Sequence, residues 1–301
     1  MLLGSLRALW SLVRDSVAAW SDDYAPSMGA ALAYYSLFSM APLLVIAIAV
    51  AGLVFGEEAA RGEILVQLEG LMGADGAHAV QGLLASVKEP GEGILATLIG
   101  LVALVIGALG VFRELHSALN RIWRVPDREE GGFWRVARKH VLSFGMVMGL
   151  GFLLVISLLV SAGLAALGRW WSDALGGWED VARILNVAVS LTALTTIYAA
   201  IYKIVPRVKL GWRDVWIGAV VTAILFSIGK ALIALYLGVV GVGSGFGAAG
   251  SLAVLLVWLY YSAQIFLLGA EFTWVYAHRY GSMAGRAEPA RPAFPRRTPR
   301  A

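Results

Sequence analysis

Six long apolar stretches, separated by polar connections, set the pattern of this 301-residue sequence. They run over Met28–Phe55, Ile94–Phe112, Val141–Leu167, Ile184–Tyr202, Val215–Val240 and Leu252–Tyr276. A helix needs about 20 apolar residues to cross the hydrocarbon core of a bilayer, and each stretch is near that length or longer. The alternating pattern of a membrane β-barrel does not occur in them. Since a segment in lipid must satisfy its own backbone hydrogen bonds, the pattern predicts an all-α, polytopic membrane protein with about six transmembrane helices.

Two regions outside these stretches show the spacing of amphipathic helices. In residues 1–27 the apolar positions recur at helical intervals: Leu6, Leu9, Trp10, Val13, Val17 and Trp20. We therefore expect an N-terminal amphipathic helix, which lies either flat on the inner membrane face or against cytoplasmic loops. Between Glu57 and Gly93, two apolar stripes flank the run Gly73–Gly76. This arrangement predicts two short amphipathic helices on the outer surface.

Basic residues gather in alternate connections, and this alternation predicts the topology. Seven Lys or Arg lie in residues 113–139, four in residues 203–213 and six in residues 279–300. The connection Glu57–Gly93 has only two, against seven acidic residues. Because Lys and Arg stay on the cytoplasmic side, both termini are expected in the cytoplasm. The expected organisation is a cytoplasmic amphipathic helix (1–27), a six-helix transmembrane domain (28–277) and a disordered Pro/Arg-rich cytoplasmic tail (278–301).

Composition agrees with a membrane location. Hydrophobic residues make up 59% of the chain and charged residues 15%, whereas a soluble domain carries roughly 25% charged residues. The net charge of +4 raises the question of nucleic-acid binding. The arginines follow the topology, however, so membrane lipids are the expected partners and nucleic acid is not.

Enzyme chemistry finds little support in the sequence. With no cysteine, the chain has no thiolate nucleophile, disulfide or Cys-based zinc site. Its four histidines lack HxH or HExxH spacing, and the adjacent pair Asp22–Asp23 is expected to be solvated. The run Gly245–Gly250 fits GxGxxG, but no strand precedes it, so a turn between helices explains it better than dinucleotide binding. We therefore expect no catalytic residue, no metal site, no cofactor and no enzymatic activity.

Polar residues inside the predicted spans are the candidate functional residues, because lipid makes them costly. Lys230 lies deep in the fifth stretch. It either pairs with an anionic substrate or lipid phosphate, or extends its long side chain to the outer headgroups. On the sixth stretch, Tyr260, Gln264 and Glu271 share one helical face. These groups either bind a headgroup or carry protons, or they hydrogen-bond neighbouring helices together.

The first apolar stretch carries further candidates. Tyr35 and Ser39 stand on one face, and Pro42 follows shortly after. Proline removes a backbone hydrogen bond, so the helix is expected to kink near Phe38. A kink beside hydroxyl groups can line a passage or a gate, while ordinary helix packing explains the same residues.

Three stretches carry a resemblance to a known family. They are Ala30–Pro42 (AALAYYSLFSMAP), then Ala118–Trp123 (ALNRIW) with Val205-Pro206, Gly218-Ala219 and Gly229-Lys230, and last Gly247–Leu252 (GAAGSL), Trp258–Gln264 (WLYYSAQ) and Gly269–Glu271 (GAE). Together they resemble the YihY/BrkB family of bacterial inner-membrane proteins. The resemblance implies six spans in the bacterial inner (plasma) membrane. It also implies a link to serum resistance and to lipopolysaccharide or lipid transport.

An older ribonuclease BN label of the same family is not expected to apply here. RNA hydrolysis needs an acidic metal cluster or a His pair on a water-facing surface, and the sequence predicts neither. The leading hypothesis is transport or export of a lipid or other amphiphilic anion linked to the cell envelope. The alternative is a membrane scaffold or envelope-integrity partner that does not transport, in which the intramembrane polar groups only hold helices together.

Overall fold

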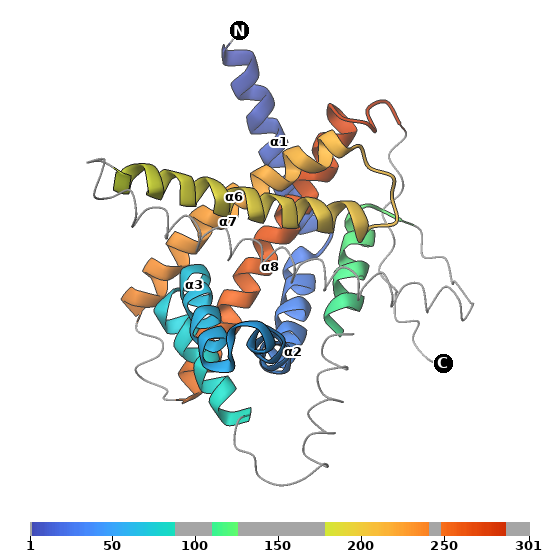
Figure 1. Ribbon diagram of the computed structural model, residues 1–301. Helices are drawn as coiled ribbons and strands as arrows, with labels where there is room; N and C mark the ends of the chain where they lie inside the picture. Colours follow the sequence, from blue (N-terminus) through green and yellow to red (C-terminus); the bar gives the residue numbers. More distant parts are fainter. Residues whose placement is uncertain (1, 88–109, 126–177, 241–247, 287–301) are drawn as a thin grey trace, which may run out of the picture. The chain divides into compact units, whose positions relative to one another are not determined.

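The computed structural model describes residues 2–87, 110–125, 178–240 and 248–286 (Figure 1). Within these ranges all regular structure is helical and no strand occurs, as the apolar pattern predicts. The helices are α1 (Leu2–Asp22), α2 (Ala25–Phe55), α3 (Glu57–Val87), α6 (Trp178–Ile204), α7 (Trp212–Val240) and α8 (Ala248–Arg279), and residues 110–122 are also helical.

The chain divides into two compact units, which are described separately. Unit 1 comprises Met1–Ala118 and Leu225–Glu271, and unit 2 comprises Leu119–Ile224 and Phe272–Ala301. Helices α1, α2 and α3 therefore belong to unit 1, and α6 belongs to unit 2. Helices α7 and α8 are divided between the units. The part of α7 up to Ile224 belongs to unit 2 and the rest to unit 1, whereas the part of α8 up to Glu271 belongs to unit 1 and the rest to unit 2.

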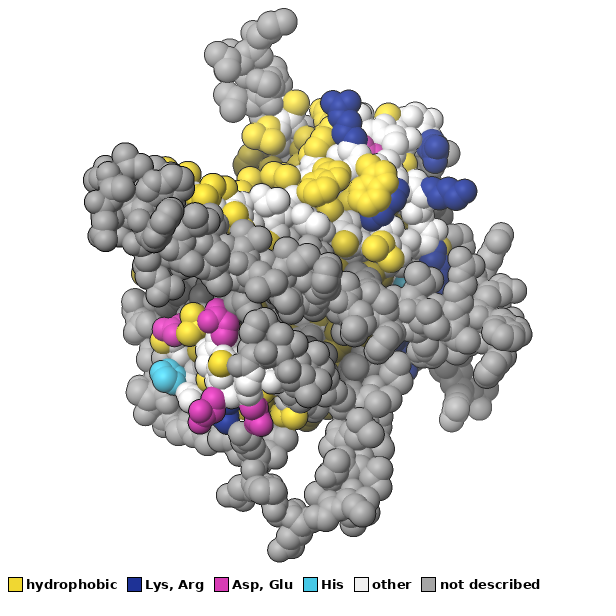
Figure 2. All heavy atoms as spheres, viewed as in Figure 1, with side chains coloured by type: hydrophobic (Ala, Val, Ile, Leu, Met, Phe, Trp, Pro, Cys, Tyr) yellow, Lys and Arg dark blue, Asp and Glu magenta, His cyan; other side chains and the backbone are white. Residues whose placement is uncertain are grey.

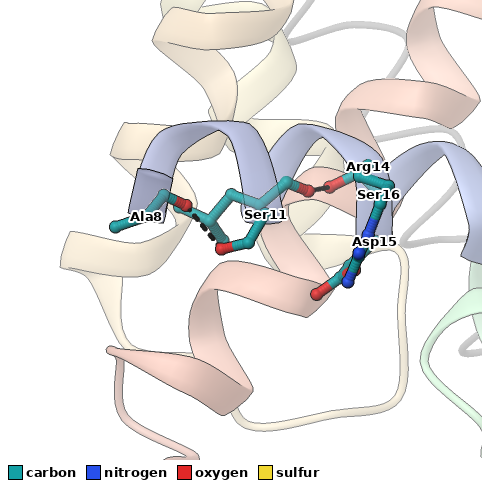
Figure 3. A network of polar contacts seen from close by, with 6 residues as sticks. Ala8, Ser11, Arg14, Asp15 and Ser16 are labelled. Carbon is teal, nitrogen blue, oxygen red and sulfur yellow. Dashed lines mark hydrogen bonds and ion pairs between the residues drawn. The ribbon is translucent and has the colours of Figure 1, made fainter. Parts of the chain in front are cut away.

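Helix α1 has a buried face and an exposed apolar face. The exposed apolar side chains are Leu9, Trp10, Val13 and Val17. On the buried face, the Ser16 hydroxyl donates to the Leu12 carbonyl at 2.7 Å, which satisfies a polar group on the packed side (Figure 3). Arg14 and Asp15 form an ion pair at 3.0 Å in the same part of the helix (Figure 3). The segment is helical as expected, and its placement flat on a membrane stays a prediction.

The core of unit 1 is built by α2, α3 and α8. Helix α2 has Pro26 in its first turn, where the missing backbone N–H is not needed. Helix α3 is interrupted at Gly73 (φ 79°), inside the glycine-containing run where the sequence predicts a break. The buried side chains shared by these helices are Ala33, Ile48, Met72, Ala79, Val80, Leu84, Leu255 and Leu259. The placement of the two halves of α3 on an outer surface stays a prediction.

Glycines allow α7 and α8 to approach each other closely. In unit 1, a Cβ placed on Gly229 would lie 2.7 Å from the Tyr261 hydroxyl oxygen. In unit 2, a Cβ placed on Gly218 would lie 1.8 Å from Thr273 Oγ1. Small residues at helix crossings are typical of membrane proteins, because backbone proximity increases van der Waals contact there.

A buried hydrogen bond joins α6 to α7 in unit 2. The hydroxyl oxygens of Tyr202 and Thr222 lie 3.1 Å apart. Thr222 donates its own proton to the Gly218 carbonyl at 2.7 Å, so the Tyr202 hydroxyl is the donor to Thr222. Both buried hydroxyls are thereby satisfied, which a packed apolar surrounding requires.

Three helices of the described part are long and apolar enough to cross a membrane. Their apolar windows are Val187–Ile204, Trp212–Ile233 and Leu252–Arg279, and these fall on the fourth, fifth and sixth predicted spans. The first predicted span, Met28–Phe55, lies within α2 as helix. The span Val141–Leu167 and nearly all of Ile94–Phe112 lie outside the described residues. The total of six therefore stays a prediction.

Helix α8 is longer than a bilayer requires. Its apolar window has 28 residues, which at 1.5 Å per residue corresponds to about 42 Å. The hydrocarbon core is only about 30 Å thick. Either α8 tilts strongly or one of its ends projects from the core.

Candidate functional site

The side chain of Gln264 links α8 to the first turn of α2 in unit 1. Its Nε2 donates to the Pro26 carbonyl at 3.4 Å. Gly29 makes this approach possible, because a Cβ there would lie only 2.1 Å from the same nitrogen. The Gln264 Oε1 atom is buried and accepts no hydrogen bond from the described residues. The amide nitrogen of Gln264 therefore joins α8 to α2, while its amide oxygen takes no part in this contact.

Glu271 is the one acidic residue of the candidate set. It lies seven residues after Gln264 on the same face of α8, and its side chain is 0% exposed. Leu267 and Ala270 beside it on the helix are also fully buried. A buried carboxyl group is costly in its charged form unless it is paired, and such groups mark functional positions in membrane proteins.

Tyr260 shares the helical face of these two residues but not their burial. Its side chain is 38% exposed. The burial of α8 changes along its length: from Ile265 to Val275, nearly every side chain is buried, whereas the first half of the helix has an exposed side. The structure therefore buries Glu271 fully and Gln264 in part, and it leaves Tyr260 exposed.

Lys230 lies on α7 beside the close crossing with α8. It is half-buried and follows Gly229, against which Tyr261 and Ile265 of α8 pack. Ile265 is the direct chain neighbour of Gln264. The crossing thus keeps the only basic residue of the fifth predicted span close to the helix that carries the candidate polar groups.

The candidates on α2 make ordinary structural contacts. The Ser39 hydroxyl donates to the Ser36 carbonyl of its own helix at 3.1 Å. Tyr35 is half-buried, and a Cβ on Gly110 would lie 2.5 Å from its ring atom Cδ1. Helix α2 continues through Pro42, so the predicted kink there stays a prediction.

Asp23 is an interior acid that the sequence interpretation missed. Only 1% of it is exposed, whereas its neighbour Asp22 is exposed, so the expectation of a solvated pair is wrong for Asp23. The buried residues Leu12, Ser16 and Ala19 follow the spacing of one helical face. Asp23 continues that spacing and donates its backbone N–H to the Ala19 carbonyl at 2.9 Å. The spacing of small and apolar residues on α1 is the signal that could have identified it.

Unit 2 has a separate polar cluster that ties the end of the described chain to α7. Asp214, in the first turn of α7, accepts hydrogen bonds from the Ser282 backbone N–H (2.9 Å) and hydroxyl (2.6 Å). The predicted disordered tail starts at residue 278, yet α8 continues to Arg279 and the turns after it bury Met283. The tail beyond residue 286 lies outside the described residues.

Aromatic rings hold two basic side chains in place in unit 2. The Arg124 guanidinium lies 3.9 Å from the centre of the Trp274 ring, and Arg124 has a left-handed backbone (φ 51°). The Lys203 ammonium lies 5.1 Å from the Trp212 ring and donates to the Leu210 carbonyl. Such cation–π contacts hold both the aromatic ring and the basic side chain in position. No cluster of metal-ligating side chains occurs among the residues the structure describes.

Comparison with known proteins identifies the family. A family model described as virulence factor BrkB matches residues 16–293. A UPF0761 membrane protein of Pseudomonas aeruginosa is 30% identical over 252 residues, which cover 82% of this chain and 58% of that protein. A UPF0761 membrane protein of Cronobacter sakazakii is 29% identical over 282 residues, covering 90% and 88%. The membrane protein YihY of Escherichia coli O1:K1 is 35% identical over 182 residues, covering 59% and 58%.

The chain thus spans 58% of the length of the Pseudomonas relative that it matches. No solved structure matches it. The family match covers nearly the whole sequence, and the described part has three helices suited to crossing a membrane. This chain is therefore an integral membrane protein and belongs to the YihY/BrkB family.

Proposed function

We propose that this protein acts in the bacterial inner membrane, with both termini in the cytoplasm, and transports or exports a lipid or other amphiphilic anion. The observation that carries the proposal is the full burial of Glu271 on a helix apolar enough to cross a membrane. Burial of a carboxyl group at such a position is energetically unfavourable. Residues of this kind usually line a path for ions, protons or substrate.

The contacts of α8 support a position for these groups near the cytoplasmic end of the proposed path. Gln264 meets the first turn of α2 at Pro26, and this turn lies at the end of α2 that the charge pattern assigns to the cytoplasm. Glu271 lies seven residues further along α8, about 10 Å at the helical rise. In this proposal Gln264 and Glu271 line the cytoplasmic entrance, and Lys230 attracts the anionic group of the substrate.

A scaffold without transport activity is the second candidate, because specific contacts favour it. Gln264 bonds α8 to α2, and Ser39 bonds within its own helix. Tyr35 packs on Gly110. The contacts of Gln264 and Tyr35 are of the kind that hold helices together in lipid, and an interhelical hydrogen bond there contributes about 1 kcal/mol. The scaffold predicts that loss of the candidate side chains changes stability alone.

Removal of the two charges is expected to slow lipid movement without unfolding the protein. We expect Lys230→Gln and Glu271→Gln each to reduce movement of fluorescent phosphatidylglycerol by about tenfold. Such a change corresponds to loss of about 1.4 kcal/mol of favourable interaction. The measurement uses full-length protein in vesicles of phosphatidylethanolamine and phosphatidylglycerol, with a membrane-impermeant quencher that reports the label in the outer leaflet.

Glu58→Gln supplies the matched control, because Glu58 is an exposed acid on α3. It should leave lipid movement at the wild-type rate, and thermal unfolding in detergent should be alike for all variants. Equal movement in all four proteins would contradict the assignment of Lys230 and Glu271. If wild type moves no more lipid than empty vesicles, while Glu271→Gln unfolds at lower temperature, the scaffold is correct instead.

A further inference from the structure

The junction between α6 and α7 exposes aromatic and basic side chains together. Trp212 is 58% exposed and Trp216 is 41% exposed. Lys209 and Arg213 are also exposed. We call these four residues the α6–α7 rim; all belong to unit 2. In the space-filling view, large hydrophobic side chains lie beside Lys and Arg side chains in the region where Figure 1 shows this junction (Figure 2).

The exposed charge of this rim is of one sign. The acidic residue in residues 203–216 is Asp214, which is buried and accepts two hydrogen bonds from Ser282. Its charge is thus turned inward, while Lys209 and Arg213 face outward. A rim of this kind attracts anions and repels cations.

Lys203 holds the exposed tryptophan of this rim in place. Its ammonium group donates to the Leu210 carbonyl and lies over the Trp212 ring at 5.1 Å. This contact uses one face of the ring, so the rest of the indole remains at the surface. An exposed indole that is already held in place costs little further ordering on binding.

An apolar stripe leads from the rim along α7. Exposed Val220 and Ile224 follow Trp212 and Trp216 at four-residue intervals on one side of the helix. The opposite side carries buried Val215, Ala219 and Thr222. Tryptophan at one end of an apolar stripe is typical of a helix that enters a bilayer, with the indole at the level of the headgroups.

We propose that the α6–α7 rim binds the headgroups of anionic phospholipids in the membrane around the protein. The apolar stripe contacts acyl chains, the two indoles lie in the interface, and Lys209 and Arg213 contact lipid phosphate. Each basic residue near an anionic leaflet adds attraction that salt screens. This inference goes beyond the proposed function, because the rim would bind lipid whether or not the protein transports it.

The test compares lipid retention by full-length protein in a neutral detergent. Native mass spectrometry counts phosphatidylglycerol and phosphatidylcholine molecules that remain bound to wild type, Arg213→Gln and the double variant Lys209→Gln/Arg213→Gln. Wild type should prefer phosphatidylglycerol. The single variant should bind it about fivefold more weakly and the double variant about 25-fold more weakly, with phosphatidylcholine binding unchanged. Added salt should reduce the preference of wild type.

Arg286→Gln is the control for loss of one positive charge, because Arg286 is exposed in unit 2 but lies outside the rim. It should retain wild-type lipid preference. Equal retention of both lipids by wild type, or an equal loss in Arg286→Gln and Arg213→Gln, would overturn the proposal. So would tight binding of a short single-stranded RNA that depends on Arg213, since the rim would then be a nucleic-acid surface.

Discussion

Replacing Gly218 with alanine is expected to destabilise the protein by about 1–3 kcal/mol, although alanine is the better helix former. The added Cβ would lie 1.8 Å from Thr273 Oγ1 and 2.7 Å from Thr273 Cβ. Rotation of the threonine side chain moves Oγ1 but leaves Cβ in place, so the backbones of α7 and α8 must separate. The gain in helix propensity, about 1 kcal/mol at most, does not offset this.

Gly82→Ala is the matched control, because this glycine is also helical and a Cβ on it would meet nothing within 4 Å. We expect it to be neutral or stabilising, as measured by thermal unfolding in detergent. The variant Gly218→Ala/Thr273→Gly removes the obstructing Cβ and should recover part of the loss, giving a favourable coupling in a double-mutant cycle. A Gly218→Ala protein as stable as wild type would show that the close crossing of α7 and α8 is not present.

The helices were largely predictable because their hydrophobic pattern is long and continuous. The fourth, fifth and sixth apolar stretches lie inside α6, α7 and α8. The helices extend beyond the stretches by a few residues at most of their ends, since a polar residue ends an apolar run but does not end backbone hydrogen bonding. The break at Gly73 was also predictable, because glycine tolerates the positive φ that the break adopts.

The candidate site was predictable only in part. Helical spacing puts Tyr260, Gln264 and Glu271 on one face of α8, but their burial differs, because Tyr260 is exposed, Gln264 half-buried and Glu271 fully buried. Spacing gives the direction in which a side chain points around the helix axis. It does not show whether other helices pack against that part of the helix. The contact of Gln264 with Pro26 joins residues 238 positions apart. No local pattern specifies such a pairing.

The fold of the chain after α8 was not predictable for the same reason. Its composition is rich in Pro and Arg, which favours disorder. Ser282 in this segment is nevertheless bound to an acid located 68 positions earlier in the chain. Asp214 could be recognised from sequence as an acid in the first turn of a helix, where it suits the helix dipole. Its partner Ser282 could not.

Removal of the Asp214 carboxyl group is expected to cost about 3 kcal/mol and to release the segment after α8. Asp214→Ala loses two hydrogen bonds to a charged acceptor, and it leaves the Ser282 N–H without its acceptor. Ser282→Ala removes only the hydroxyl bond and should cost about 1 kcal/mol. The unfolding free energy of full-length protein in detergent measures both effects, and the rate of tryptic cleavage at Arg279 and Arg286 reports release of the segment.

Glu58→Ala distinguishes the Asp214–Ser282 interaction from a general effect of acidic residues in the first turn of a helix. Glu58 also lies in the first turn of its helix, but it is exposed, so its loss should cost only about 0.3–1 kcal/mol through the helix dipole. Because Asp214 acts through bonds to Ser282, the effects of Asp214→Ala and Ser282→Ala should not add in the double variant. Additive losses, or cleavage rates equal to wild type in Asp214→Ala, would show that the two residues act separately. The segment after α8 would then depend on other contacts, of which the burial of Met283 is the next to test.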